Sequence, residues 1–412
     1  MLPVAVQVAS LASLWVAWQG NLGVAANSRG GARSGVGDMG QAKVGYDVDV
    51  GAGLGLQLRE SRFNLGLGYG PNFTVRDVNG RDRALLVMHG GSLNLGFGGR
   101  GYALGLSQSL SLGTTSFRGL RNTPVDPMAM PNPTMPRVDL VPTVETAKVF
   151  NASTNASFNY QWDARLTSGA GAGYSISGGS GSSQTAFPQV RTATGSLSTG
   201  YLMSGRDSFG VQAALARITT KGGTTMTAPM GPLVMSPDFL YWTLNSGLNW
   251  SHRFSAATNG TLNGGAFGYS TTSPGHTTLY SLALTAAGTI DTQLAHVAGF
   301  TINGGAGAGV SPAVNQLNGT MQQRVQGTGR LSATMARFSI NASADGAQSF
   351  PTGDPNAIRL LGVGAGLGYS PAQFVDFSAD YRSTWQTAGT TSIPRLWVVF
   401  VGVGVRAPPL RF

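Results

Sequence analysis

The chain has 412 residues, 61 of them glycine; 42% of its residues are hydrophobic, but only 11% are charged, where about 25% is usual. A disordered chain would carry more charge, collagen would have glycine at every third position, and a polytopic helical membrane protein would show apolar runs of about 18 residues; none of these fits the chain beyond residue 20. The net charge of +10 comes from arginines scattered singly rather than in a basic stripe, so we expect no nucleic-acid partner, and the absence of cysteine excludes disulfide frameworks and thiolate sites.

The N-terminal segment, MLPVAVQVASLASLWVAW, consists of small and apolar residues and is too short to anchor a protein firmly. Such a segment is typical of the hydrophobic region of a secretory signal, although no Lys or Arg precedes it. We predict a signal peptide over 1–19, cleaved near Trp18–Gly20, and a mature chain over 20–412.

From residue 42 onward, apolar and polar residues alternate with a period of two, which is the period of a β-strand. The segments 44–59, 63–76 and 149–162 show the pattern most clearly, and later copies lie around 240–250 and 375–385. These runs exceed the length of about 5–6 residues that is commonest for soluble strands. They suit strands that cross a membrane, which need about 9–11 residues.

The face opposite the apolar one consists of Gly, Ser, Thr and Asn rather than Lys and Glu. In 44–59, for example, Val44, Tyr46 and Val48 share one face, and Gly45 and Asp47 lie on the other. Apolar residues facing lipid and polar residues facing a lumen are the signature of a transmembrane β-barrel. A β-propeller or a soluble β-solenoid is a weaker alternative, because a Gly or Asn face could not fill its core.

Short and long connections take turns between these segments, as in outer-membrane barrels, whose periplasmic turns are the short ones. We place short turns near Glu60, Gly99, Asp163, Gly205, Arg253, Asp291, Ala336 and Ser370, and a long Pro-rich loop over 118–147. This gives seventeen strands from 42 to 406, and 20–29 can supply one more. The prediction is therefore an all-β, antiparallel up-and-down barrel of about 18 strands (16–18).

Aromatic residues gather near both ends of the predicted strands, as in the interfacial girdles of membrane barrels. Those near short turns are Tyr102, Trp162, Tyr201, Trp250 and Tyr369, and those near long loops include Trp242, Trp385 and Trp397. No nucleophile motif is present, the four histidines lack metal-ligand spacing, and the Gly-rich stretch 96–101 precedes a strand rather than a helix. We expect no enzyme activity, no metal and no cofactor.

The C-terminal sequence RLWVVFVGVGVRAPPLRF is an alternating apolar strand that ends in Phe412, with Leu410 on the matching parity. It resembles the C-terminal β-signal of Gram-negative outer-membrane proteins. The resemblance implies recognition by the barrel-assembly machinery and a location in the outer membrane. Pro408 and Pro409 depart from the pattern, since proline cannot donate to a strand ladder.

The inward face of the predicted barrel bears few charges. The candidate lumen-lining residues are Asp47, Asp49, Arg59, Arg76, Tyr241, Asp376, Asp380 and Arg382. Two interpretations stay open for the charged residues: pairs that tie neighbouring strands together, or a weak transverse field that orients a polar solute. Inward aromatics are sparse, with Tyr241 the clearest, so a continuous aromatic track is not expected.

In barrel size, small-residue lumen and chain length, the sequence resembles porin-like barrels that accompany exopolysaccharide export in Gram-negative bacteria. That resemblance implies a pore for hydrophilic solute, with a polysaccharide as one candidate, and a periplasmic export partner. The alternative is a plugged structural barrel that binds partners through its extracellular loops.

Overall fold

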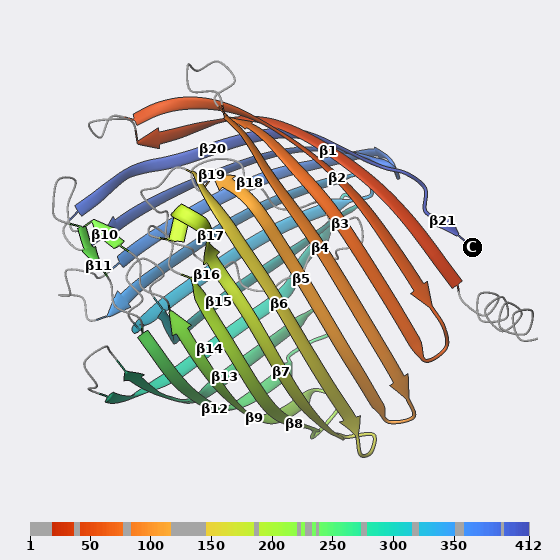
Figure 1. Cartoon of the computed structure of the whole chain (residues 1–412). Coiled ribbons are helices and arrows are strands. Elements are labelled where there is room, and N and C mark those ends of the chain that lie inside the picture. Colours follow the sequence, from red (N-terminus) through yellow and green to blue (C-terminus); the bar gives the residue numbers. More distant parts are fainter. Residues whose placement is uncertain are drawn as a thin grey trace, which may run out of the picture.

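The computed structural model describes residues 19–36, 42–76, 84–116, 146–184, 189–220, 224–226, 233–235, 239–272, 278–314, 321–350, 358–388 and 391–411. One antiparallel sheet of 19 strands closes on itself (Figure 1). Its last member, β21 (Leu410–Arg411), is a two-residue extension, which leaves eighteen long strands. The predicted 18-strand barrel is confirmed.

The long strands follow the chain in order around the barrel. They are β1 (Gln19–Val36), β2 (Ala42–Arg59), β3 (Phe63–Arg76), β4 (Ala84–Gly99), β5 (Tyr102–Ser116), β6 (Thr146–Gln161), β7 (Leu166–Gly179), β8 (Val190–Leu202), β9 (Asp207–Thr220), β12 (Phe239–Arg253), β13 (Thr258–Thr272), β14 (Thr278–Val297), β15 (Phe300–Val314), β16 (Met321–Met335), β17 (Phe338–Phe350), β18 (Ile358–Ala372), β19 (Val375–Ala388) and β20 (Thr391–Arg406). A separate hairpin, β10 (Thr224–Met226) with β11 (Leu233–Met235), and the short 3₁₀ helix η2 (Gly181–Gln184) lie in connections.

The barrel closes where β1 pairs with β20, in a register that runs from Ala25 opposite Arg406 to Arg33 opposite Val398. The strand expected over 20–29 is therefore present as β1, and it is longer than predicted. After β20, the strand ladder is interrupted at Ala407–Pro409, and pairing with β1 resumes at β21, where Leu410 lies opposite Leu22. The two prolines thus interrupt the final strand without ending its pairing with β1.

Eight connections of two to four residues, from the one after β2 to the one after β18, lie on one rim, and the hairpin turns of the orange and yellow strands gather at the lower right of Figure 1. One predicted turn is misplaced: the chain does not turn near Asp291, because β14 continues to Val297 and turns at Ala298–Gly299. These two residues have φ of 51° and 81°, as a type I′ hairpin turn requires. Likewise, the turn expected near Ser370 lies slightly later: β18 continues to Ala372, and the chain turns at 373–374.

Exposure alternates along the strands. Tyr46 and Leu54 on β2 are 51% and 49% exposed, whereas Asp47 and Asp49 between them are 2% and 3% exposed. Directly paired residues share a face of a sheet, so the registers propagate this parity around the whole barrel and assign an apolar outer face and a polar inner face. Among the described residues, no helix has the length and apolarity needed to cross a bilayer.

Some predicted features lie outside the described residues. These are the signal peptide up to residue 18, the terminal Phe412, and the Pro-rich loop except for Thr146 and Ala147, which begin β6.

Candidate functional site: the inner wall of the barrel

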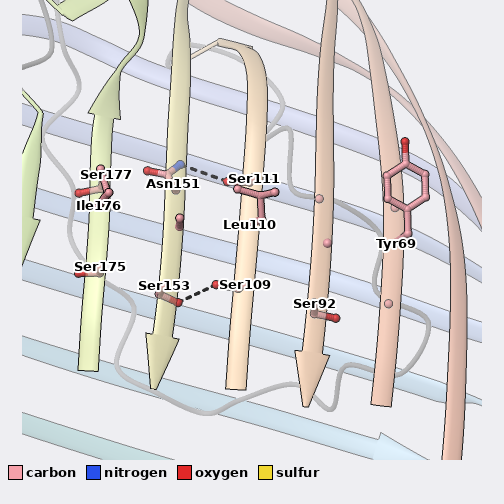
Figure 2. A pocket seen from close by; sticks show the side chains of 15 residues that line it. Tyr69, Ser92, Ser109, Leu110, Ser111, Asn151, Ser153, Ser175, Ile176 and Ser177 are labelled. Atoms are coloured by element: carbon pink, nitrogen blue, oxygen red, sulfur yellow. Dashed lines mark hydrogen bonds between the residues drawn. The ribbon is translucent and has the colours of Figure 1, made fainter. Parts of the chain in front are cut away.

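A polar concavity of about 560 Å³ lies on the inner wall, across β3 to β7 (Figure 2). Ser109 and Ser153 share a hydrogen bond of 2.7 Å across its centre, and the Asn151 amide donates to Ser111 Oγ at 3.2 Å. Its other polar side chains are Ser92, Ser175 and Ser177. The concavity therefore presents hydroxyls and an amide, which both donate and accept hydrogen bonds.

Strand register aligns these side chains in two rows around the wall. The first row runs through directly paired residues, Ser92, Ser109, Ser153, Ser175 and Thr192. The second row runs through Ser111, Asn151 and Ser177. Because both rows follow from the alternation of Ser and Asn on single strands, the sequence pattern contains the signal for them, although only the register shows that the strands align.

Glycines on the inner face leave room for side chains from the neighbouring strands. On β18, a Cβ at Gly362 would lie 2.7 Å from Asp345 Oδ2, and one at Gly366 would lie 2.6 Å from Asp380 Oδ1. Side chains of β17 and β19 thus extend over β18. Glycine here widens the lumen less than the sequence suggests, because neighbouring side chains occupy the space.

Two of the predicted lumen residues, Asp47 and Asp49, lie in a buried ion-pair network beside the closing strand. Asp47 accepts a hydrogen bond from Arg33 Nε at 2.7 Å, and Asp49 accepts two from Arg29 at 2.7 and 2.9 Å. Thr74 Oγ1 also donates to Asp49 at 2.9 Å. Neither arginine partner was predicted: Arg33 lies beyond the strand expected over 20–29, and the pairing of Arg29 with Asp49 depends on the register of β1 against β2.

The remaining predicted charges are spread along the inner wall. Arg382 reaches across β18 to Asp345 at 3.3 Å, and Asp376 pairs with Arg406 at 2.9 Å. Asp380 lies over Gly366, as described above. Arg59 is exposed at the short-turn end, and Arg76 is 7% exposed at the long-loop end.

Inner-wall aromatics are more numerous than the sequence predicts. Tyr241 is 1% exposed, and Phe267 and Tyr269 on β13 share its inward parity, with ring centroids 6.0 Å apart. Phe400 on β20 is also inward and lies under the Arg29 guanidinium at 5.4 Å. The parity of β13 is hard to assign from hydropathy, because its outer face carries mostly small residues; only pairing with β12 settles it.

Burial of the inner wall differs between the two halves of the barrel. Toward the long connections, many inward residues are 7% exposed or less, although Ser281 is exposed; examples of the buried residues are Arg33, Asn72, Met88, Val149, Thr220, Thr243 and Ser349. Toward the short turns, inward residues are exposed; examples are Gln57, Asn64, Asn94, Asn159, Ser198, Asn249 and Ser343. The inner wall is therefore more accessible on the short-turn side than on the other.

The candidate girdle residues lie on the outer face. Trp162 is 63% exposed, and its Nε1 donates to Ser168 Oγ, whereas Trp250 Nε1 donates to Asp207. At the other end, Trp242 is 44% exposed. Tyr102, Tyr201, Tyr369, Trp385 and Trp397 also lie on outward parity. Their placement at a membrane interface, like an assembly role for Leu410, stays a prediction.

Three solved structures of low sequence identity resemble the barrel, two of them named as transporters. The copper transporter OprC gives a TM-score of 0.51 at 12% identity, over 92% of this chain and 64% of that one. The FrpB iron transporter from Neisseria meningitidis gives 0.49 at 10% identity, over 94% and 82%. OccK2 from Pseudomonas aeruginosa, solved with glucuronate, gives 0.48 at 11% identity, over 95% and 98%. At such identities, the likeness to OprC shows a shared barrel fold alone.

Sequence comparison is more specific. No curated protein shows detectable similarity to the chain. The profile of the EpsX exopolysaccharide export family, however, matches residues 17–409, a range that contains all eighteen long strands. Together with the closed barrel and its apolar outer face, this match locates the protein in the outer membrane of a Gram-negative bacterium. The chain belongs to the EpsX exopolysaccharide export family.

Proposed function

We propose that the barrel is a conduit through which a hydrophilic polysaccharide crosses the outer membrane. The observation that carries this proposal is the pair of hydroxyl and amide rows on the inner wall, centred on Ser109 and Ser153. Along such a wall, the hydroxyl groups of a polysaccharide replace their hydrogen bonds to water with hydrogen bonds of similar strength to the protein. The polymer is therefore not held tightly, and its hydroxyl groups still have partners. The family to which the chain belongs is itself described by exopolysaccharide export.

The inner-wall charges favour an uncharged or weakly charged polymer. Five inward carboxylates have an arginine partner: Asp47, Asp49, Asp291, Asp345 and Asp376. Paired charges produce a weaker field in the lumen than isolated ones. Of the two interpretations open from the sequence, the structure thus favours charges that tie neighbouring strands together.

The greater accessibility of the inner wall in the short-turn half gives the conduit a direction. In an outer-membrane barrel the short turns are periplasmic, so the exposed Asn and Ser side chains would receive the polymer from that side. A periplasmic export partner would dock at this rim. The role is one of transport and not of catalysis.

The test is to narrow the lumen without changing the outer surface. Ser109→Phe with Ser153→Phe places two rings in the concavity, and Leu112→Phe with Ala156→Phe places two rings on the outward face of the same strands. In cells whose own copy is deleted, we expect the inward pair to lower surface polysaccharide toward the level of the deletion, and the outward pair to restore export. Heat-modifiable migration in detergent gels confirms that both variants form barrels.

Export that continues unchanged with a folded inward variant would contradict the conduit. It would favour the alternative, a structural barrel that acts through its extracellular loops. Single-channel recordings in planar bilayers provide the independent measurement, since a barrel with no route for ions gives no current above the lipid background.

A further inference from the structure

Basic residues on the outer face of the strands lie only toward the long-loop rim in the described part of the chain. Five exposed cations occupy outward positions there: Lys148, Arg191, Arg217, Arg359 and Arg395. Among the described strands, the one outward acid is Asp207, at the opposite rim. Cations on the lipid-facing surface are least costly at the membrane interface, and the sign is uniform, so an anionic partner at this level would satisfy them.

Two of the cations form a compact cluster with a tryptophan. On β8 and β9, Ala193 lies opposite Arg217, so Arg191 and Arg217 are diagonal neighbours, about 7–8 Å apart at Cα. Trp242 on β12 lies directly opposite Arg217, whose guanidinium is 5.7 Å from the indole ring (Figure 1 shows β8, β9 and β12 side by side). We name Arg191, Arg217 and Trp242 the first Arg–Trp cluster.

The geometry of this cluster suits a phosphate. Gln189 Oε1 accepts hydrogen bonds from Nε and Nη2 of Arg191 at 3.1 and 2.9 Å, which holds one guanidinium in place. The Trp242 ring supports the flat face of the other guanidinium and leaves its N–H edges available. Arg191 keeps its Nη1–Nη2 edge, so two guanidinium groups of like charge on neighbouring strands can share one phosphate through charge-assisted hydrogen bonds.

An apolar groove of about 410 Å³ begins beside this cluster and runs deeper along the outer face. Gly268 forms its floor between Leu244 on one side and Leu282 on the other, since the three residues are directly paired across β12, β13 and β14. Leu215, two residues below Arg217 on β9, also lines it. A charged cluster with an apolar groove directly beneath matches an amphiphile that carries a phosphate above and an acyl chain below.

A local divergence of strands opens the groove. β15 pairs with β14 only from Ala286 onward toward the short-turn rim, so the segment 278–285 has β13 as its one strand neighbour among the described residues. Tyr280 and Leu282 are therefore 82% and 77% exposed, more than the other large hydrophobic residues of the described chain, and Leu284 on the same strand follows at 72%. Their side chains form the outer wall of the groove.

A second cluster repeats the arrangement of the first on the outer face of β18, β19 and β20. Arg395 lies over the Trp385 ring at 4.8 Å, and Arg359 is diagonal to Trp385 across β18 and β19. The tryptophans at the opposite rim differ, because Trp250 and Trp162 donate to Asp207 and Ser168. Arginine thus accompanies tryptophan in both clusters at the long-loop end, the end that faces the outer leaflet.

We propose that the first Arg–Trp cluster and the groove beneath it bind a phosphorylated glycolipid of the outer leaflet. Arg191 and Arg217 hold a phosphate of its headgroup, and one acyl chain lies over Gly268 between Leu244 and Leu282. The site is separate from the lumen, and its occupancy does not depend on what the conduit carries.

The experiment compares two lipids on the purified barrel in phosphatidylcholine vesicles: bisphosphoryl lipid A and the same lipid A without its phosphates. An R359Q/R395Q background removes the second cluster. In this background we expect bisphosphoryl lipid A to bind about tenfold more tightly than the dephosphorylated form. R191Q/R217Q should abolish that preference, whereas R165Q/R206Q, in the short turns, should keep it.

The groove has a closely matched control on its own strand. Added Cβ atoms at Gly268 and Gly264 both meet open space, so leucine fits at either position. Gly268→Leu fills the groove and should weaken lipid A binding, whereas Gly264→Leu, which lies outside the groove, should leave it unchanged. Inorganic phosphate at millimolar concentration should not displace the lipid.

Equal binding of the two lipids by the barrel would overturn the proposal. This comparison needs no substitution in the first Arg–Trp cluster. Unchanged binding after R191Q/R217Q or Gly268→Leu would also overturn it. Complete displacement by inorganic phosphate would reject a membrane glycolipid as the occupant and indicate a site for free phosphate.

Discussion

The Arg33–Asp47 pair shows how the barrel accommodates charge on its inner wall. The two side chains are 4% and 2% exposed and lie on adjacent strands, with Arg33 Nε 2.7 Å from Asp47 Oδ2. A buried pair of this kind adds little net stability compared with apolar residues, but removing one partner leaves an uncompensated charge. The exposed Arg406–Asp376 pair, at 64% and 34%, lacks this property.

Asp47→Ala should lower the free energy of unfolding by about 3–5 kcal/mol, because Arg33 then stays buried without its carboxylate. Urea unfolding in lipid vesicles, followed by tryptophan fluorescence, measures the change. Asp376→Ala is the matched control and should cost about 0–1 kcal/mol, since its pair is open to water. Equal losses from the two substitutions would show that the Asp47 pair is solvated as well.

At the scale of a strand, the closing seam depends on close approach between β1 and β20. Gly31 lies directly opposite Phe400. A Cβ at position 31 would collide with the backbone carbonyl of Val399 and would lie 2.6 Å from the Phe400 ring. Backbone atoms in a closed ladder cannot rotate away as a side-chain tip can, so glycine is required here by the seam itself.

Gly31→Ala should destabilise the barrel by about 1–3 kcal/mol, the usual cost of overpacking a well-packed site. A larger fraction of unfolded protein in unboiled detergent gels, together with a lower urea midpoint, would report it. Gly195→Ala on β8 provides the control, because an added Cβ there meets nothing within 4 Å. A Gly31→Ala barrel as stable as the Gly195→Ala barrel would mean that the seam relaxes freely.

Strand identity could be predicted from the sequence because period-two alternation is a local property, and the residues of 44–59 display it without reference to any partner. Features that depend on register could not be predicted. The inward parity of Phe267 needs the pairing of β13 with β12, and the partners of Asp47 and Asp49 need the pairing of β2 with β1. The turn expected near Asp291 was wrong because β14 extends five residues beyond its pairing with β13.

For the candidate site, the sequence predicted the polar character of the inner wall but not its arrangement. Asp376 and Asp380 share a strand with Arg382, yet the Arg382 partner is Asp345, two strands away across Gly362. That contact depends on glycine at position 362, because a side chain there would occupy the space that Asp345 uses. A pattern along one strand cannot reveal it.

At the scale of the whole molecule, the inner wall has an exposed half at the short turns and a largely buried half at the long connections. Asn159 and Ser198 represent the exposed half, and Asn72 and Thr243 represent the largely buried half. All four lie on the inward parity, so the difference between them is one of depth along the barrel rather than of face.

The absence of native cysteine makes this difference measurable by labelling. Single substitutions Asn159→Cys and Ser198→Cys should react readily with a membrane-impermeant thiol reagent, and Asn72→Cys and Thr243→Cys should react about tenfold more slowly or less, because reactivity follows exposure. Labelling of the urea-unfolded protein confirms that all four thiols are present. Similar rates at the four positions in the folded barrel would mean that the long-connection half is exposed too.

The pairing of β1 with β20 also has a kinetic consequence. Every other long-strand pair joins neighbours in the chain and can form as a local hairpin, whereas Ala25 and Arg406 come from nearly opposite ends of the sequence. The entropy of closing so large a loop grows only logarithmically with its length, so closure is not prohibitively costly once the other strands are in place. Until then, however, the nascent sheet exposes two long unpaired edges, and such edges readily pair with other chains. Aggregation during biogenesis should therefore originate at this single seam, and the interval before β20 reaches β1 is the period in which the chain most needs protection.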